Sequence, residues 1–143
     1  MTQQVSVFLE NKPGRLEKVT AVLKEQHINI RAITVSTSPE GWGILNMLVD
    51  QPEKAREVLS QTGHPVALRE ILVVEITDRP GMLHDLLFWL KNAGINVQNA
   101  YGAVLRKGQA AVLALDVDDL ERATTLLAEH DLAPLATEQV AQI

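Results

Sequence analysis

The chain has 143 residues, with 13 Lys and Arg against 18 Asp and Glu, so its formal net charge is −5. No run of Lys or Arg forms a basic stripe, which argues against nucleic acid as a partner. The chain contains no cysteine, which excludes disulfides and thiolate chemistry. No apolar run approaches the roughly 20 residues that span a bilayer, and the first residues do not form a signal segment. We therefore expect a cytoplasmic protein without membrane contact.

The first half of the chain predicts the order strand, helix, strand, strand, helix, strand. Val5 to Leu9 alternates apolar and polar residues, as a strand with one buried face does. Asn11 then stands where a helix N-cap belongs, with Pro13 in the first turn of the helix. The later elements follow as a strand over 28–37, a turn at 38–41, a strand over 44–49, a helix over 51–61 and a short strand over 66–68. This is the ferredoxin-like plan.

The second half repeats this order. We predict a strand over 72–77, a helix over 80–93, strands over 95–105 and 110–117, a helix over 120–129 and a last strand over 133–137. The boundary falls near Arg69 and Glu70, without a Gly-, Pro- or Ser-rich linker. So short a join predicts two modules, 1–69 and 70–143, that are fixed against each other.

Two short motifs occur once in each half, at the same separation. Asn11-Lys12-Pro13-Gly14-Arg15-Leu16 returns as Asp78-Arg79-Pro80-Gly81-Met82-Leu83. Ile28-Asn29-Ile30 returns as Ile95-Asn96-Val97 at the same offset. The apolar spacing moves with the motifs, so the chain is two copies of one module of about 70 residues. Any site in one copy therefore has a counterpart in the other.

This pattern resembles the ACT domain, over essentially the whole chain and in two tandem copies without an attached catalytic domain. The resemblance implies an α+β fold: two tandem ferredoxin-like βαββαβ modules that form one continuous antiparallel eight-stranded sheet with helices on one face. It also implies a regulatory protein, and a homodimer built on that sheet. In this family the ligand, an amino acid or another small molecule, usually sits where two modules meet, between the Pro-Gly loop of one and strand two of the other.

The residues of the motifs suit an amino acid for physical reasons. The first amides of a helix have no intrahelical partner and lie at the positive end of the helix dipole, so they can hold a carboxylate. Gly14 and Gly81 lack a Cβ and let a ligand approach the backbone. The ammonium group needs acceptors, and Asp78 offers a charged one where Asn11 offers a neutral one. We therefore expect the loop of Asp78 to bind more tightly.

The candidate ligand-binding residues come from both motifs in both halves. They are Asn11, Gly14, Arg15, Leu16, Asn29, Ile30, Asp78, Gly81, Met82, Leu83, Asn96 and Val97. The apolar members of this set favour a free amino acid with an apolar, aromatic or histidine-like side chain over serine or glycine. The resemblance agrees, because serine-binding members carry a His at the positions held here by Leu9 and Ile76.

Other interpretations of the same residues stay open. Asn11 and Asp78 could simply cap helices, which is compatible with ligand binding, and Asn29 and Asn96 could terminate turns. The chain could be a ligand-free regulatory subunit that assembles with a metabolic enzyme. An acylphosphatase-like enzyme would use Arg15 and Asn29, but Met82 replaces the arginine in the second copy. No catalytic constellation is present, and the four histidines lack metal-binding spacing, so we expect neither catalysis nor a cofactor.

Overall fold

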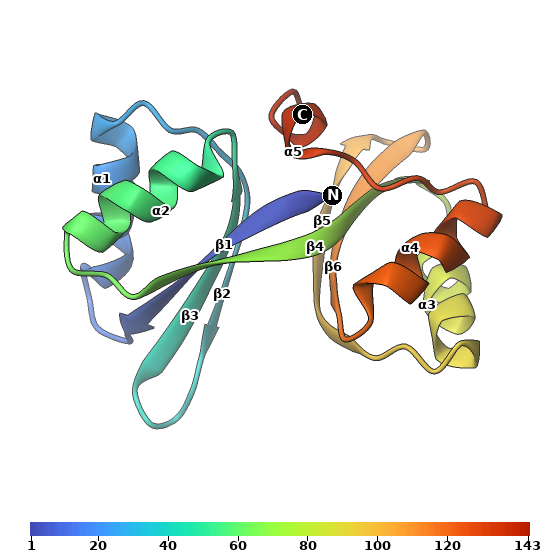
Figure 1. Cartoon of the computed structure of the whole chain (residues 1–143), viewed down its shortest axis with the longest axis horizontal. Coiled ribbons are helices and arrows are strands. Elements are labelled where there is room, and N and C mark those ends of the chain that lie inside the picture. The colour runs from blue at the N-terminus through green and yellow to red at the C-terminus, as the bar shows by residue number, and fades with distance from the viewer. The chain divides into compact units, whose positions relative to one another are not determined.

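The structure is a computed structural model that describes residues 1–143 and separates into two compact units. The N-terminal unit comprises Gln3–Arg69 with Thr137–Ile143, and the C-terminal unit comprises Glu70–Ala136 with Met1–Thr2 (Figure 1). Each end of the chain therefore belongs to the unit that the other half of the sequence builds. No helix combines the length and the apolar character needed to cross a membrane.

The first 61 residues give the N-terminal unit a three-stranded framework and two helices. Their bounds are Thr2–Glu10 for β1, Arg15–Glu25 for α1, Ile30–Thr37 for β2, Trp42–Val49 for β3 and Pro52–Gln61 for α2. β3 pairs antiparallel with both β1 and β2, so that Met47 lies opposite Val5 on one side and Ile33 on the other. Both helices lie on the same side of these strands (Figure 1).

The core of this unit lies between the strands and the two helices. The alternation of β1 buries Val5, Val7 and Leu9 on one face, as its sequence predicts. Helical spacing brings Val19 and Leu23 of α1 onto the same core. Burial of these side chains, each worth about 1.5–3 kcal/mol relative to exposure, holds α1 in place above β1.

The C-terminal unit repeats this arrangement. Its elements are α3 (Met82–Asn92), β5 (Val97–Arg106), β6 (Ala110–Val117) and α4 (Leu120–Glu129), which follow β4 (Val66–Thr77). β6 pairs antiparallel with both β4 and β5. Leu72 and Val74 of β4 share a core with Leu86 and Leu90 of α3, so the predicted helical and strand periodicities of the second copy are confirmed.

The chain has six strands, in the order β2-β3-β1-β4-β6-β5. The prediction of eight strands in the sheet is therefore wrong. The predicted strands over 66–68 and 72–77 are one strand, β4, because no Gly or Pro interrupts the chain between them. Residues 66–69 of β4 belong to the N-terminal unit and residues 70–77 to the C-terminal unit.

The predicted last strand over 133–137 is also absent. Pro134 removes a backbone donor at the second residue of that segment. One backbone bond remains, from the amide of Leu135 to the carbonyl of Val73 at 2.7 Å. The chain then enters a short helix, α5 (Thr137–Val140), which the sequence did not predict. Val140 of this helix is buried in the structure.

Candidate functional site

The first loop, residues 11–14, ends in a left-handed glycine directly before helix α1. Gly14 has a φ of 85° and is the cap residue, without a side-chain hydrogen bond to the helix. A residue with a Cβ is strained in this conformation, which explains the glycine. The predicted N-cap role of Asn11 is therefore wrong, and Pro13 precedes the helix instead of lying in its first turn. The amide of Asn11 donates to the carbonyl of Gly41 at 2.8 Å and holds the loop against the β2–β3 turn.

The second loop, residues 78–81, has the same backbone. Gly81 has a φ of 88° and caps α3, again without a side-chain bond, so Asp78 is not the N-cap either. Its amide donates to the carbonyl of Gln109 at 3.2 Å, and its Oδ2 accepts the amide of Gly108 at 2.7 Å. Asp78 therefore holds the β5–β6 turn with its carboxylate, a bond that Asn11 does not make in the first loop.

In both helices the amides of the second and third residues have no acceptor in the protein. The amide of the first helical residue bonds back into each loop, from Arg15 to the carbonyl of Lys12 and from Met82 to that of Arg79, each at 3.3 Å. The next amides, which have no acceptor in the protein, are those of Leu16, Glu17, Leu83 and His84. With the positive end of the helix dipole behind them, these amides suit a carboxylate or another anion.

The two loops differ in how far side chains cover them. A Cβ placed on Gly14 would meet no atom within 4 Å, whereas one on Gly81 would lie 3.9 Å from Nη1 of Arg79. Arg79 is held there by Asp85, which accepts from Nη2 at 2.9 Å. The first loop is therefore the more open, and the second carries a guanidinium beside its glycine.

The strand-two asparagines have a repeated role through their backbone. The amide of Asn29 donates to Oδ1 of Asp50, and the amide of Asn96 donates to Oδ1 of Asp118, both at 2.9 Å. The reverse backbone bonds, from the amide of each aspartate to the asparagine carbonyl, are both 3.1 Å. The asparagine side chains are exposed. Sequence reasoning missed the two aspartates, although both directly follow an apolar strand.

The structure places the loop and the asparagine of one module at opposite ends of strand two. The first loop is bonded to the turn after β2, at Gly41, whereas Asn29 is bonded to Asp50 beyond the opposite end of the β2–β3 pair. The eight residues of β2 separate these ends, which at about 3.3 Å per residue is roughly 25 Å. A single small ligand cannot contact both groups within one module.

Of the apolar residues in the predicted set, only the two leucines are freely available. Leu16 is 39% exposed and Leu83 is 45% exposed, and each follows a loop glycine by two residues. Met82 is buried in the core, and Ile30 and Val97 are partly buried against the two cores. The apolar wall that a ligand could contact is therefore smaller than the sequence suggested.

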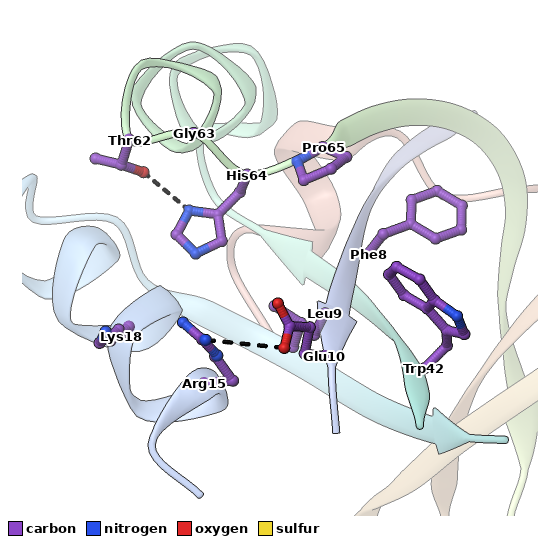
Figure 2. Close-up of a pocket in the computed structure, with 10 residues that line it drawn as sticks. All are labelled: Phe8, Leu9, Glu10, Arg15, Lys18, Trp42, Thr62, Gly63, His64 and Pro65. Carbon is purple, nitrogen blue, oxygen red and sulfur yellow. Dashed lines mark hydrogen bonds and ion pairs between the residues drawn. The ribbon is translucent and has the colours of Figure 1, made fainter. Parts of the chain in front are cut away.

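A cavity of about 360 Å³ lies beside the first loop, within the N-terminal unit. Figure 2 shows its lining, which comes from β1, α1, the start of β3 and the α2–β4 connection. The lining residues are Phe8, Leu9, Glu10, Arg15, Lys18, Trp42, Thr62, Gly63, His64 and Pro65. Among the predicted site residues, only Arg15 lies here. Sequence analysis missed the other nine lining residues because the lining comes from four separate parts of the chain and forms no sequence motif.

Two basic side chains set the electrostatics at the edge of this cavity. Nζ of Lys12 lies 2.9 Å from Oε2 of Glu10, and Nη2 of Arg15 lies 3.8 Å from the same oxygen. The hydrogen bond and charge of Lys12, with a smaller contribution from Arg15, hold the pKa of Glu10 below its ordinary value. Glu10 is therefore an ionised carboxylate at neutral pH. No group of three or more His, Cys, Asp or Glu side chains is placed to hold a metal ion.

Comparison with protein families gives a match along the entire chain. The family described as the ACT domain pair matches residues 1–143. Among curated proteins, none matches the sequence.

Solved structures similar to this chain agree with the family match. Protein BT0572 from Bacteroides thetaiotaomicron superposes with a TM-score of 0.90 at 27% identity, covering 99% of this chain and 96% of that one. The regulatory subunit of aspartate kinase from Thermus thermophilus, in a ligand-free form, gives a TM-score of 0.65 at 18% identity, covering 89% of this chain and 90% of that one. The corresponding subunit from Thermus flavus gives 0.61 at 19%, covering 90% of each chain. The two kinase subunits share the fold.

Proposed function

The chain belongs to the ACT domain pair family, and on that premise we propose that it is a non-catalytic regulatory protein that binds a free amino acid at its Pro-Gly loops. The observation that carries the proposal is the repeated helix start. Twice, a left-handed glycine leads into a helix whose next two amides have no acceptor in the protein. These amides are donors for the ligand carboxylate.

The ammonium group needs an acceptor close to the same loop. In the second loop this is Asp78, whose Oδ2 already accepts one amide but has further acceptor capacity as a carboxylate. Because Asn29 and Asn96 lie at the far ends of their own modules, an asparagine can contribute only from another ACT module. The proposed site is thus composite, with the loop of one module and strand two of another.

The proposed ligand class follows from the exposed leucines. Leu16 and Leu83 offer apolar contact beside the open amides, and the side chains of serine and glycine are too small or too polar to use it. An unpaired hydroxyl buried there would cost roughly 1–3 kcal/mol. A branched, aromatic or histidine side chain therefore fits better than serine or glycine.

A thermal-shift screen against the twenty amino acids tests this function. A ligand that binds only the folded protein stabilises it by about 2.7 kcal/mol at one hundred times its Kd. We expect a rise in melting temperature with one or a few larger apolar, aromatic or imidazole amino acids. A response to serine or glycine alone would contradict the ligand class, and no response to any amino acid would contradict the function.

A second candidate function is a ligand-free regulatory subunit that assembles with an enzyme. An exposed apolar surface on α3 favours it, because Leu83, Leu87 and Phe88 are 45%, 37% and 47% exposed. Such a group on one helix is typical of a contact with another protein. The amino-acid screen separates the two functions, since this candidate requires no stabilisation by any free amino acid.

A further inference from the structure

We propose that the cavity in Figure 2 is a second ligand site, present only in the N-terminal unit, for a small organic dianion with an apolar or aromatic part. The dianion is a phosphate monoester or a dicarboxylate, which share two negative charges on oxygen atoms. This site is separate from the open amides of the loops and does not depend on amino-acid binding there.

One end of the cavity carries positive charge without a matching negative charge. Arg15 and Lys18 lie three residues apart on α1, so they project from neighbouring positions on the helix. Glu10 is the only acid in the lining, and Lys12 from outside the cavity already pairs with it at 2.9 Å. Arg15 contacts that carboxylate only at 3.8 Å, and Lys18 has no acidic partner. Two cations are thus left for a ligand.

His64 adds an oriented donor or acceptor at the same end. Its Nδ1 lies 3.0 Å from Oγ1 of Thr62, which fixes the ring. Figure 2 shows the imidazole directed from the α2–β4 connection toward the space around Glu10 and Arg15. The second ring nitrogen, Nε2, therefore remains available for a ligand oxygen.

The other end of the cavity is aromatic. Phe8 is 47% exposed and Trp42 is 59% exposed, and their rings lie beside each other in Figure 2, across β1 from the cations. Aromatic residues make up only 3% of the chain, so two exposed rings on one cavity are unusual for this sequence. They offer a flat apolar surface to the organic part of a ligand.

The second module is an internal control for this assignment. The register Glu10–Trp42 in the first module corresponds to Thr77–Ala110 in the second, and the repeated motif matches Arg15 with Met82. At the same offset of 67 residues Lys18 corresponds to Asp85, and at the offset of 68 residues that holds from β3 onward His64 corresponds to Leu132. The same fold therefore forms without these cations, the imidazole or the indole, so the architecture does not require them.

The charge balance selects a dianion over a zwitterion. Arg15 presents a planar fork that suits two oxygens of a phosphate or carboxylate, and Lys18 supplies a compact charge beside it. A monocarboxylic amino acid would neutralise only one of these cations and would bring its ammonium group next to the other. A ligand with two anionic groups and no ammonium group pairs with both cations and avoids this repulsion.

Calorimetric titration at constant ionic strength tests the proposal with inorganic phosphate, malonate and phenyl phosphate as probes. We expect saturable binding of phosphate or malonate at about millimolar concentration, and the tighter of the two identifies the head group. Phenyl phosphate should bind more tightly than inorganic phosphate. Trp42→Ala should remove that advantage without changing the affinity for inorganic phosphate, because the indole contacts only the organic part.

Lys18→Met and Lys24→Met form a matched pair on α1, since Lys24 lies outside the cavity. We expect Lys18→Met to weaken dianion binding roughly tenfold, the effect of one charge-assisted contact, and Lys24→Met to leave it unchanged. Saturation by none of the probes, or equal effects of the two substitutions, would overturn the proposal. Because Lys18 lines the cavity and none of the four residues with open amides does, its substitution tests this site independently of the amino-acid screen.

Discussion

Gly14 and Gly81 decide where the two loop helices begin, and they show how far single residues could be interpreted from sequence. The Asn/Asp-x-Pro-Gly pattern correctly predicted a helix after the first strand of each module. It did not reveal that the glycine itself is the cap, because the φ values of 85° and 88° move the helix start past the proline. The polar residue at the head of each motif therefore bonds to a neighbouring turn through its backbone.

Asp78 has two separable roles, which one conservative substitution can distinguish. Asp78→Asn keeps an oxygen that can accept the amide of Gly108 but removes the charge. We expect stability to change by less than about 1 kcal/mol, because the hydrogen bond survives. Amino-acid affinity at the second loop should fall about tenfold or more if the carboxylate holds the ammonium group. Calorimetric titration measures this, and unchanged affinity would restrict Asp78 to holding the turn.

Tyr101 gives a pH dependence that a single spectroscopic signal can follow, because it is the only tyrosine. Burial, and secondarily the charge of Asp116, raise the pKa of Tyr101 above its ordinary value. Because the folded protein favours the neutral phenol, burial of Tyr101 contributes fully to stability below about pH 10, and this contribution is lost as the pH rises further. We expect phenolate absorbance to appear together with unfolding at alkaline pH. Ionisation of Tyr101 in the fully folded protein near its ordinary pKa would contradict this.

At the scale of elements, the strands and helices that bury a regular apolar pattern were predictable. Val5 to Leu9 alternates and forms β1, and Val19 and Leu23 at helical spacing form the buried side of α1. The incorrect strand predictions lie where the presence or absence of a strand-breaking residue matters more than the apolar pattern. β4 runs through the expected module boundary because nothing breaks it, and Pro134 prevents the last strand. The cavity was not predictable, since pattern analysis does not bring four elements together.

Strand β5 contains a glycine that the close approach of β6 requires. A Cβ on Gly102 would overlap the carbonyl oxygen of Val112, whereas a Cβ on Gly43 in β3 would meet its neighbours at 3.6 Å or more, an ordinary contact distance. We expect Gly102→Ala to destabilise the protein by about 1–3 kcal/mol through this overlap, and Gly43→Ala to have a much smaller effect. Thermal or denaturant unfolding compares the two. Equal free energies of unfolding for the two variants would show that β5 shifts away from β6 without loss of stability.

For the whole molecule, the repeat gives two similar frameworks with different surfaces. Both modules keep the left-handed glycine, the open amides and the aspartate that binds strand two. Only the N-terminal unit carries the basic and aromatic cavity, and only the second loop has a carboxylate bonded to its neighbouring turn. The two proposals therefore assign different ligand chemistries to one duplicated framework.

The edge strand β2 suggests how a second copy would be recruited. β2 is terminal in the strand order, and Ile33 and Val35 on it are 45% and 43% exposed. We propose a homodimer that covers this edge, and we expect light scattering to give twice the chain mass. Ile33→Lys should produce monomers because a lysine on an edge strand opposes pairing, whereas Gln61→Lys on α2 should not. Dimers that persist in Ile33→Lys would place the contact elsewhere.

An amino acid bound to the open amides at the helix starts should perturb those amides, and amide NMR during a titration tests this binding most directly. The titration uses the amino acid that gives the largest thermal shift. We expect the largest saturable shifts at the amides of Leu83 and His84, of Leu16 and Glu17, or of both pairs. Binding that leaves all four amides unmoved and shifts residues elsewhere in the chain would contradict the claim.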